Sequence, residues 1–286
     1  MRDDARTMVL ACVFTAGCFV AALAQPAKPA PPTFDVPPLE VARPVVVCGN
    51  CDKPFDMSTH KQVLEGLVGN PYIGELRKAL YVQDIWHQFE SKAHFDNCDF
   101  EGATAYLTEL IAEAGKHADA ARAAKSANNT GAMQDAVKRA FFVLGQALHA
   151  VQDFYAHTNY VELQTPKFKK ITDMEILTPW LPSGRNQIEQ FQKEGLVSGY
   201  VFWGFPQKCP ASTISHHDLA KDSATTKSGQ KTVSHLQNFS QYRIAVFLAR
   251  EASQLLMDDA FRRWPILKEV NGENVAFEIL LDRRGL

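Results

Sequence analysis

The sequence has almost no net charge, with 30 Lys and Arg side chains against 32 Asp and Glu, a formal net charge of −2 over 286 residues. Proteins that hold nucleic acid by bulk electrostatics carry a strong basic excess, so this chain does not belong to that class. The small acidic balance also provides no bulk attraction to anionic membranes. Overall charge therefore leaves the substrate class open, and individual motifs must decide it.

Two structural patterns are also missing. The sequence contains no Gly-rich P-loop, so any phosphate binding must use groups other than the backbone N–H donors of such a loop. Alternating apolar and polar runs, which are typical of strands, are nearly absent. Helical periodicity dominates instead, and an apolar content of 46% is enough for one large helical domain. We therefore predict an all-α fold with several helices and long loops.

The first residues have the features of an export signal. Arg2 and Arg6 precede an apolar run over residues 8–24 that ends in small side chains. We predict cleavage near Ala24 and a secreted or periplasmic mature protein. The alternative is a retained membrane anchor, for which a run of about 17 residues is at the short limit of a bilayer span.

The rest of the chain divides into three predicted parts. Residues 25–47 are rich in proline, which favours an extended linker with little capacity to pack. Residues 48–265 carry the helical periodicity and form the predicted zinc-binding domain, and residues 266–286 form a C-terminal tail. Within the domain, helices are expected at about 58–68, from the Asn-Pro turn at 70–71 to about 92, and at 101–126, 132–158, 186–194 and 229–263.

Four of the six cysteines follow the predicted cleavage site, at Cys48, Cys51, Cys98 and Cys209. An even number in an exported protein favours two disulfides, although the sequence does not decide their connectivity. The alternative is that Cys48 and Cys51 form half of a zinc knuckle, but the sequence has no second Cys-x-x-Cys to complete it.

The segment around residues 140–160 carries the clearest chemical signal. His149, Asp153 and His157 stand four residues apart, so a helix places all three on one stripe. Two imidazoles and a carboxylate are ligands that zinc accepts. Apart from the histidines, Asp153 is the only ionisable acid or base with a formal charge in this segment, and an isolated carboxylate in an apolar helix is costly unless it is paired or metal-bound. The alternative is a partly exposed His-Asp-His ladder that stabilises the helix.

Other candidate ligands are scattered along the chain. Taken singly, each also fits a helix cap, a polar loop residue or a packed histidine. In chain order they are His60, Asp84, His94, His216 and Asp222.

The motif LHxxxDFYxHxN at residues 148–159 resembles the signature of heterokaryon-incompatibility (HET-C) type proteins. These belong to the wider superfamily of zinc-dependent phospholipases C and zinc single-strand nucleases. Three further stretches match in the family's order: TH at 59–60, HFD at 94–96 and HxxLxKD at 216–222. The last histidine of the central motif follows the aspartate by four residues, as in the HET-C branch.

The resemblance implies a cluster of two or three zinc ions. One metal shell would consist of Asp84, His94, His149 and Asp153, with Glu90 as the alternative to Asp84. Asp153 would bridge to a metal held by His60, and a further metal would be held by His157, His216 and Asp222. Whether His216 or His217 is the ligand stays open.

The resemblance also implies a zinc-dependent phosphoric ester hydrolase, phospholipase C-like or nuclease-like, in which a metal-activated water attacks phosphorus. Asp153 and His149 would then be the catalytic residues. The alternative is a non-enzymatic, HET-C-like recognition or toxicity protein whose zinc site is structural.

An aromatic loop bears on the substrate. Its side chains Tyr200, Phe202, Trp203 and Phe205 provide an apolar surface for transient membrane contact, as binding of a phospholipid head group would require. The alternative is a loop packed over the core. A nuclease would need stacking aromatics beside basic residues, and the sequence gives no strong signal of that kind.

Overall fold

The computed structural model describes residues 72–201 and 208–270. This part of the chain is mostly helical, which confirms the predicted all-α class. Among these residues, no helix is both long and apolar enough to cross a membrane. The predicted signal peptide, the Pro-rich linker, the helix at 58–68 and most of the C-terminal tail lie outside the described residues.

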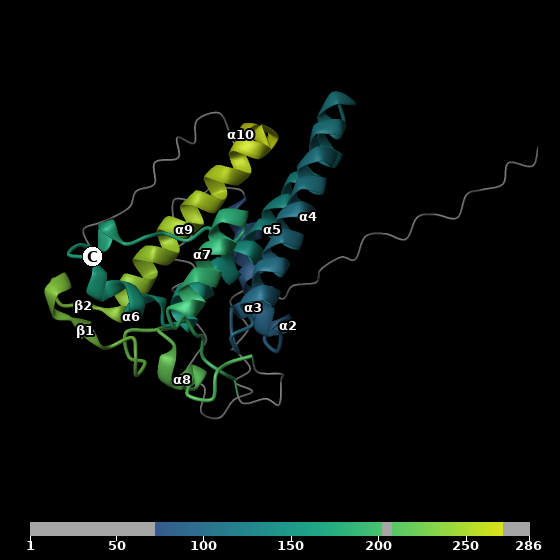
Figure 1. The fold of residues 1–286 in the computed structure, drawn as a ribbon. Coiled ribbons are helices and arrows are strands. Elements are labelled where there is room, and N and C mark those ends of the chain that lie inside the picture. Colours follow the sequence, from purple (N-terminus) through teal and green to yellow (C-terminus); the bar gives the residue numbers. More distant parts are fainter. Residues whose placement is uncertain (1–71, 202–207, 271–286) are drawn as a thin grey trace, which may run out of the picture. The chain divides into compact units, whose positions relative to one another are not determined.

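Two long antiparallel helices form the framework, α4 (Phe100–Ser126) and α5 (Thr130–His157) (Figure 1). Both begin at a capping side chain, because Asp99 accepts a hydrogen bond from the backbone N–H of Gly102 and Asn129 accepts one from that of Ala132. The predicted helices at 101–126 and 132–158 are therefore confirmed to within two residues.

Helix α5 lies at the centre of the fold. It packs against α4, against α2 (Ile73–Trp86) and against α9 (Gln241–Arg263). Because neighbours cover it on several sides, every residue from Ala147 to His157 is buried. The His-Asp-His stripe thus lies inside the protein, and the alternative of a partly exposed ladder is wrong.

Two of the expected helices are shorter than predicted. The helix after residue 71 ends at Trp86 and is followed by a turn and the short α3 (Ser91–His94). The helix predicted over 229–263 begins only at Gln241, and a small antiparallel pair of strands precedes it. Gln237 and Asn238 have φ values of 56° and 58°, a left-handed conformation that a right-handed helix cannot contain.

The remaining elements are short. The helix predicted near 186–194 is α7 (Pro182–Lys193), and α10 (Pro265–Val270) crosses the predicted boundary of the tail. The others are α6 (Tyr160–Gln164), η1 (Thr165–Lys167), η2 (Ile171–Asp173), α8 (His216–Leu219), β1 (Thr232–Val233), η3 (Ser234–Leu236) and β2 (Phe239–Ser240).

A disulfide joins Cys98 to Cys209 across 111 residues of sequence. The Cys98 backbone N–H also donates to the Ser198 hydroxyl at 2.8 Å, so the turn after α3 is fastened to the segment that leads to α8. The Cys98–Cys209 bond is one of the two predicted disulfides. Cys48 and Cys51 lie outside the described residues.

Candidate metal centre

Eight ionisable side chains converge at one end of α5. They come from α2, from α3 and the turn after it, from α5 itself, and from α8 and the segment that follows it. Each side chain is at most 13% exposed. The set consists of Asp84, His94, Asp96, His149, Asp153, His157, His216 and Asp222.

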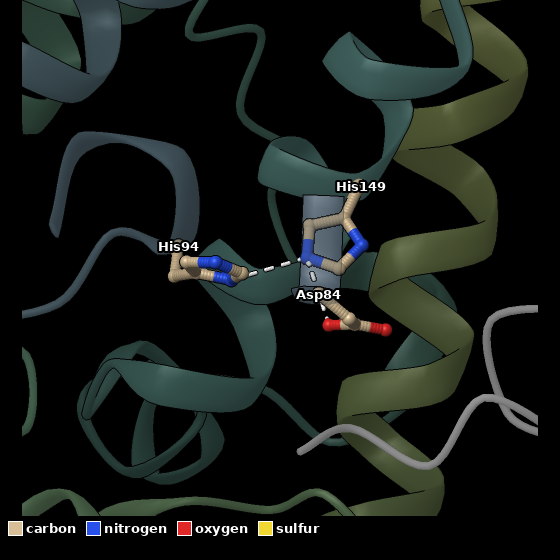
Figure 2. A group of neighbouring side chains, drawn as sticks. All are labelled: Asp84, His94 and His149. Atoms are coloured by element: carbon tan, nitrogen blue, oxygen red, sulfur yellow. Dashed lines mark hydrogen bonds and ion pairs between the residues drawn. The ribbon is translucent and has the colours of Figure 1, made fainter. Parts of the chain in front are cut away.

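Asp84, His94 and His149 form the first group that could hold a metal ion (Figure 2). Their ligand atoms all lie within 4.8 Å of one another. His149 Nε2 is central, at 3.5 Å from Asp84 Oδ1 and 3.1 Å from His94 Nδ1. Three separate helices, α2, α3 and α5, thus direct their donor atoms to one point.

Asp153 adds a fourth donor to this group. Its Oδ2 lies 2.9 Å from His94 Nδ1 and 2.9 Å from His149 Nε2, one helical turn earlier on α5. His94 Nε2 lies 3.2 Å from the carbonyl oxygen of His87, which fits donation of its N–H to that oxygen. A histidine held in this way keeps its other nitrogen available as a metal ligand.

The second group consists of Asp96, His157 and His216. His216 Nδ1 lies 2.8 Å from Asp96 Oδ1, and His157 Nδ1 lies 3.5 Å from the same oxygen. His217 is exposed, so His216 is the histidine of this pair that reaches the cluster.

Asp222 faces the other nitrogens of the same two histidines. Its Oδ1 lies 3.2 Å from His157 Nε2, and its Oδ2 lies 3.5 Å from His216 Nε2. His157 Nδ1 is also 2.9 Å from the carbonyl oxygen of His94, an acceptor that directs Nε2 toward Asp222 and toward Asp153 Oδ1 at 4.0 Å. The Nε2 atoms of the two histidines therefore face the carboxylates of Asp222 and Asp153. Asp96 contacts Nδ1 on the opposite side of the His216 ring and orients that ring.

Buried charges shift the pKa values in opposite directions. Burial, together with the nearby charge of Asp153, raises the pKa of Asp84 to about 8. Burial opposes the charged form of His157, but Asp153 and Asp96 outweigh it and raise its pKa to about 9. Burial also works against the ionised form of Asp153, yet the charges of His149 and His157 hold its pKa well below the ordinary value. In the metal-free protein, the raised pKa values favour the protonated forms of Asp84 and His157, which lowers the net negative charge of the cluster.

Unusual backbone positions the ligands after α3. Phe95, Asn97 and Cys98 all have φ between 54° and 56°, a conformation that costs free energy for residues other than glycine. The Asn97 side chain offsets part of this cost, because Nδ2 donates to the Ser91 hydroxyl at 2.6 Å and Oδ1 accepts from the Val201 N–H at 2.7 Å. These turns place His94 and Asp96 on two different groups of the cluster.

Gly199 joins three of the ligand-bearing segments. Its N–H donates to the carbonyl oxygen of His157 at 3.0 Å, and its own carbonyl accepts from the Asn97 N–H at 2.9 Å. A Cβ at this position would lie 2.4 Å from the Cα of His216, so only glycine allows α8 to approach this closely.

The structure brings together every predicted ligand except His60, which lies outside the described residues. Asp84 rather than Glu90 joins the cluster, because Glu90 pairs with His87 and Lys92 and its side chain is 41% exposed. The prediction missed Asp96 as a ligand candidate. The sequence did contain a signal for Asp96. This carboxylate lies two residues after His94, in the HFD stretch that was selected for its histidine.

The predicted membrane-contact loop is only partly described. Tyr200 is partly exposed, and its N–H lies 3.4 Å from the carbonyl oxygen of Ile214. Phe202, Trp203 and Phe205 lie outside the described residues.

Comparison with known families gives one match. A family model described as the VWA7 N-terminal domain matches residues 73–173. The matched stretch runs from α2 to η2 and contains the whole first group together with Asp96, Asp153 and His157, whereas His216 and Asp222 lie beyond it. No curated protein and no solved structure matches the chain.

Proposed function

We propose that the chain is a zinc-dependent phosphoric ester hydrolase, related to the HET-C type proteins, with two metal ions bridged by Asp153. The position of Asp153 carries the proposal. Its Oδ2 faces His94 and His149, whereas its Oδ1 faces His157 across 4.0 Å. A carboxylate between two sets of imidazoles is the arrangement that a pair of cations requires.

The donor set suits zinc. Donors around a tetrahedral zinc at its usual bond lengths lie about 3.3 Å apart. The contacts of the first group that involve His149 Nε2 range from 2.9 to 3.5 Å. Within the described part of the chain, Asp84 Oδ1, His157 Nε2 and both oxygens of Asp222 are buried and make no hydrogen bond of acceptable geometry, and their nearest ion-pair partners lie 3.2 to 3.5 Å away. Such buried atoms are costly unless a cation engages them.

Charge balance supports two ions rather than one. The cluster contains the carboxylates of Asp84, Asp96, Asp153 and Asp222, each with a side chain at most 9% exposed. Their four negative charges equal the positive charge of two divalent ions, with all of the histidines neutral. One ion would leave two negative charges buried without a counter-ion, unless histidines or carboxylates kept protons.

The protein residues would hold and orient this centre. Bound zinc would lower the pKa of a coordinated water toward neutrality and stabilise charge that develops on phosphoryl oxygens. Asp153 would fix the spacing between the two sites, and His149 would anchor the first. Asp96 would hold the ring of His216, whose side chain, at 13% exposed, is the most accessible of the cluster.

A phospholipid head group is the substrate that we propose. Trp86 is 75% exposed and Phe89 is 41% exposed, and both follow Asp84 within five residues. Exposed aromatics beside the centre, with the loop at Tyr200, Phe202, Trp203 and Phe205, would contact a lipid surface transiently. Export of the mature protein belongs to the same proposal, and the disulfide between Cys98 and Cys209 is compatible with it.

The test is a hydrolysis assay on the zinc-loaded mature protein. The substrates are a chromogenic phosphodiester, phosphatidylcholine vesicles and single-stranded DNA, and the matched variant is Asp153→Asn. We expect zinc-dependent hydrolysis of the diester and the vesicles that the variant lacks. Hydrolysis of DNA alone would replace the proposed substrate. Absence of turnover with all three substrates, on protein shown to contain zinc, would refute the hydrolase.

One observation favours a second candidate, a recognition protein with a structural zinc site. His149 and Asp153 are at most 1% exposed, and structural sites are closed whereas catalytic sites keep an open position. In that case zinc would raise the melting temperature without any turnover. The same assay, combined with a melting curve of the zinc-loaded and chelated protein, separates the two candidates.

A further inference from the structure

Lys221 is a fully buried lysine beside the metal centre. Burial of an ammonium is costly unless every N–H finds an acceptor. Lys221 Nζ donates to the carbonyl oxygens of Thr158 at 2.8 Å and Leu219 at 3.1 Å, and it lies 3.1 Å from Glu162 Oε2. Two hydrogen bonds and one close ion pair thus surround the ammonium.

These acceptors lie next to metal-ligand candidates. Thr158 directly follows His157, the last residue of α5, and Leu219 ends α8, the helix that begins at His216. Asp222 directly follows Lys221 in the chain. The ammonium therefore ties together the end of the helix that carries His157, the end of the helix that carries His216, and the backbone that presents Asp222.

Glu162 connects this bridge to the rest of the fold. Its Oε1 accepts a hydrogen bond from the Ser228 hydroxyl at 3.0 Å, and that hydroxyl lies 2.8 Å from Oε1 of Gln241, the first residue of α9. The position of Lys221 is thus fixed from α6 and α9. By contrast, Asp84 and His94 lie on α2 and α3, which none of these three side-chain contacts reaches, and His149 lies nine residues before the contacted Thr158.

We infer that Lys221 is a positioning residue that builds the His157–His216–Asp222 half of the metal centre and leaves the Asp84–His94–His149 half intact. This inference rests on the proposed two-metal centre. It assigns to one buried side chain a selective effect on one of the two ions, which a general contribution to folding would not produce.

The test is a metal titration of the full mature chain with zinc, and with cobalt(II), whose visible absorption reports coordination at each site. Lys221→Met keeps an unbranched side chain and removes all three donors. Glu162→Gln is the milder variant, because it keeps the size of the side chain and one acceptor oxygen while it removes the charge and the second acceptor oxygen. Lys231→Met is the matched control, since it removes one positive charge from an exposed position in the same part of the chain.

For Lys221→Met we expect one equivalent of metal to bind as in the wild type and the other to weaken by about 10- to 100-fold, the usual effect of losing an outer partner of a metal ligand. Glu162→Gln should weaken the same equivalent by a smaller factor, and Lys231→Met should match the wild type. If Lys221→Met does not fold, Glu162→Gln decides the question in the same way.

The outcomes distinguish the inference from the proposal beneath it. A wild type that binds no metal refutes the centre itself. A wild type with two ions, alongside a folded Lys221→Met that also binds two with unchanged affinity, refutes the role of Lys221 alone. Equal weakening of both equivalents in the variants would also overturn the inference, because it would reduce Lys221 to a general stabiliser of the fold.

Discussion

Asp153 Oδ2 lies 2.9 Å from Nε2 of His149, the residue one helical turn earlier on α5. Both side chains are at most 1% exposed. Helical spacing alone explains their proximity, but their burial depends on α2, α4 and α9, which surround α5. The contact therefore depends both on the local spacing of the two residues and on the tertiary packing around α5. The first prediction concerns Asp153.

Asp153→Asn should lose most of the bound metal. An amide oxygen is a weak neutral ligand and does not bridge two cations as a carboxylate does. We expect less than one equivalent of zinc by elemental analysis and no remaining hydrolysis. Zinc at the wild-type stoichiometry in this variant would remove Asp153 from the centre. Glu90→Gln, which changes an exposed carboxylate near α3, should retain the metal.

Stability should depend on pH and metal together. The pKa of Asp84 is raised from 3.8 to about 8 and that of His157 from 6.5 to about 9 in the folded, metal-free chain. A raised pKa contributes stability that is complete only below the unfolded value and is lost as pH rises through the folded value. Chelated protein should therefore melt at lower temperature as pH rises from 6.5 toward 9.

Metal affinity should change in the opposite direction over the same interval, because zinc competes with those protons. At a thousandfold excess over the dissociation constant, zinc adds about 4 kcal/mol, or roughly 10 °C for a domain of this size. The difference in melting temperature between loaded and chelated protein should widen with pH. Scanning calorimetry across the interval measures it, and a constant or narrowing difference would contradict the assigned histidine and aspartate ligands.

The disulfide should support both the fold and the second group. A loop of 111 residues closed by a disulfide predicts a stability loss of up to about 5 kcal/mol on removal. Replacing Cys98 and Cys209 together by serine also frees the turn that carries Asp96. Denaturant unfolding should show the loss, and a metal titration should show weaker binding at the second group. Unchanged metal binding would mean that the turn holds its shape through Asn97 and Ser198 alone.

Gly199→Ala should disturb the second group by a steric route. The added Cβ would lie 2.4 Å from the Cα of His216, which must move α8 away from α5. We expect lower affinity for one equivalent of metal and little change at the other. Gly131→Ala is the matched control, because its Cβ meets only Asn129 Oδ1 at 3.9 Å. Two wild-type affinities in Gly199→Ala would show that this close approach is not needed.

Much of this arrangement could be predicted from residue patterns. The period of three and four residues gave α4 and α5 almost to their ends, and four-residue spacing placed His149, Asp153 and His157 on one stripe. The start of α9 was beyond such reasoning, because the residues at 229–240 include apolar side chains at helical spacing. In the structure, the left-handed Gln237 and Asn238 and the paired strands β1 and β2 occupy this segment instead of a helix.

The grouping of the ligands was less accessible to sequence. Asp84 and Glu90 are both acidic residues shortly before His94, and their different environments arise because α2 ends at Trp86 and the chain turns outward before Glu90. The role of Lys221 also depends on burial. No spacing rule indicates that this lysine points inward to the carbonyl oxygens of Thr158 and Leu219.

The two metal-ligand groups become complete at different times during synthesis. The first needs only the stretch from Asp84 to Asp153, whereas the second waits for His216 and Asp222. A chain that ends after α5 therefore contains every donor of the first group but lacks His216 and Asp222. If the proposed two-metal centre forms, a chain truncated after α5 would keep the donors of the first ion and lose donors of the second.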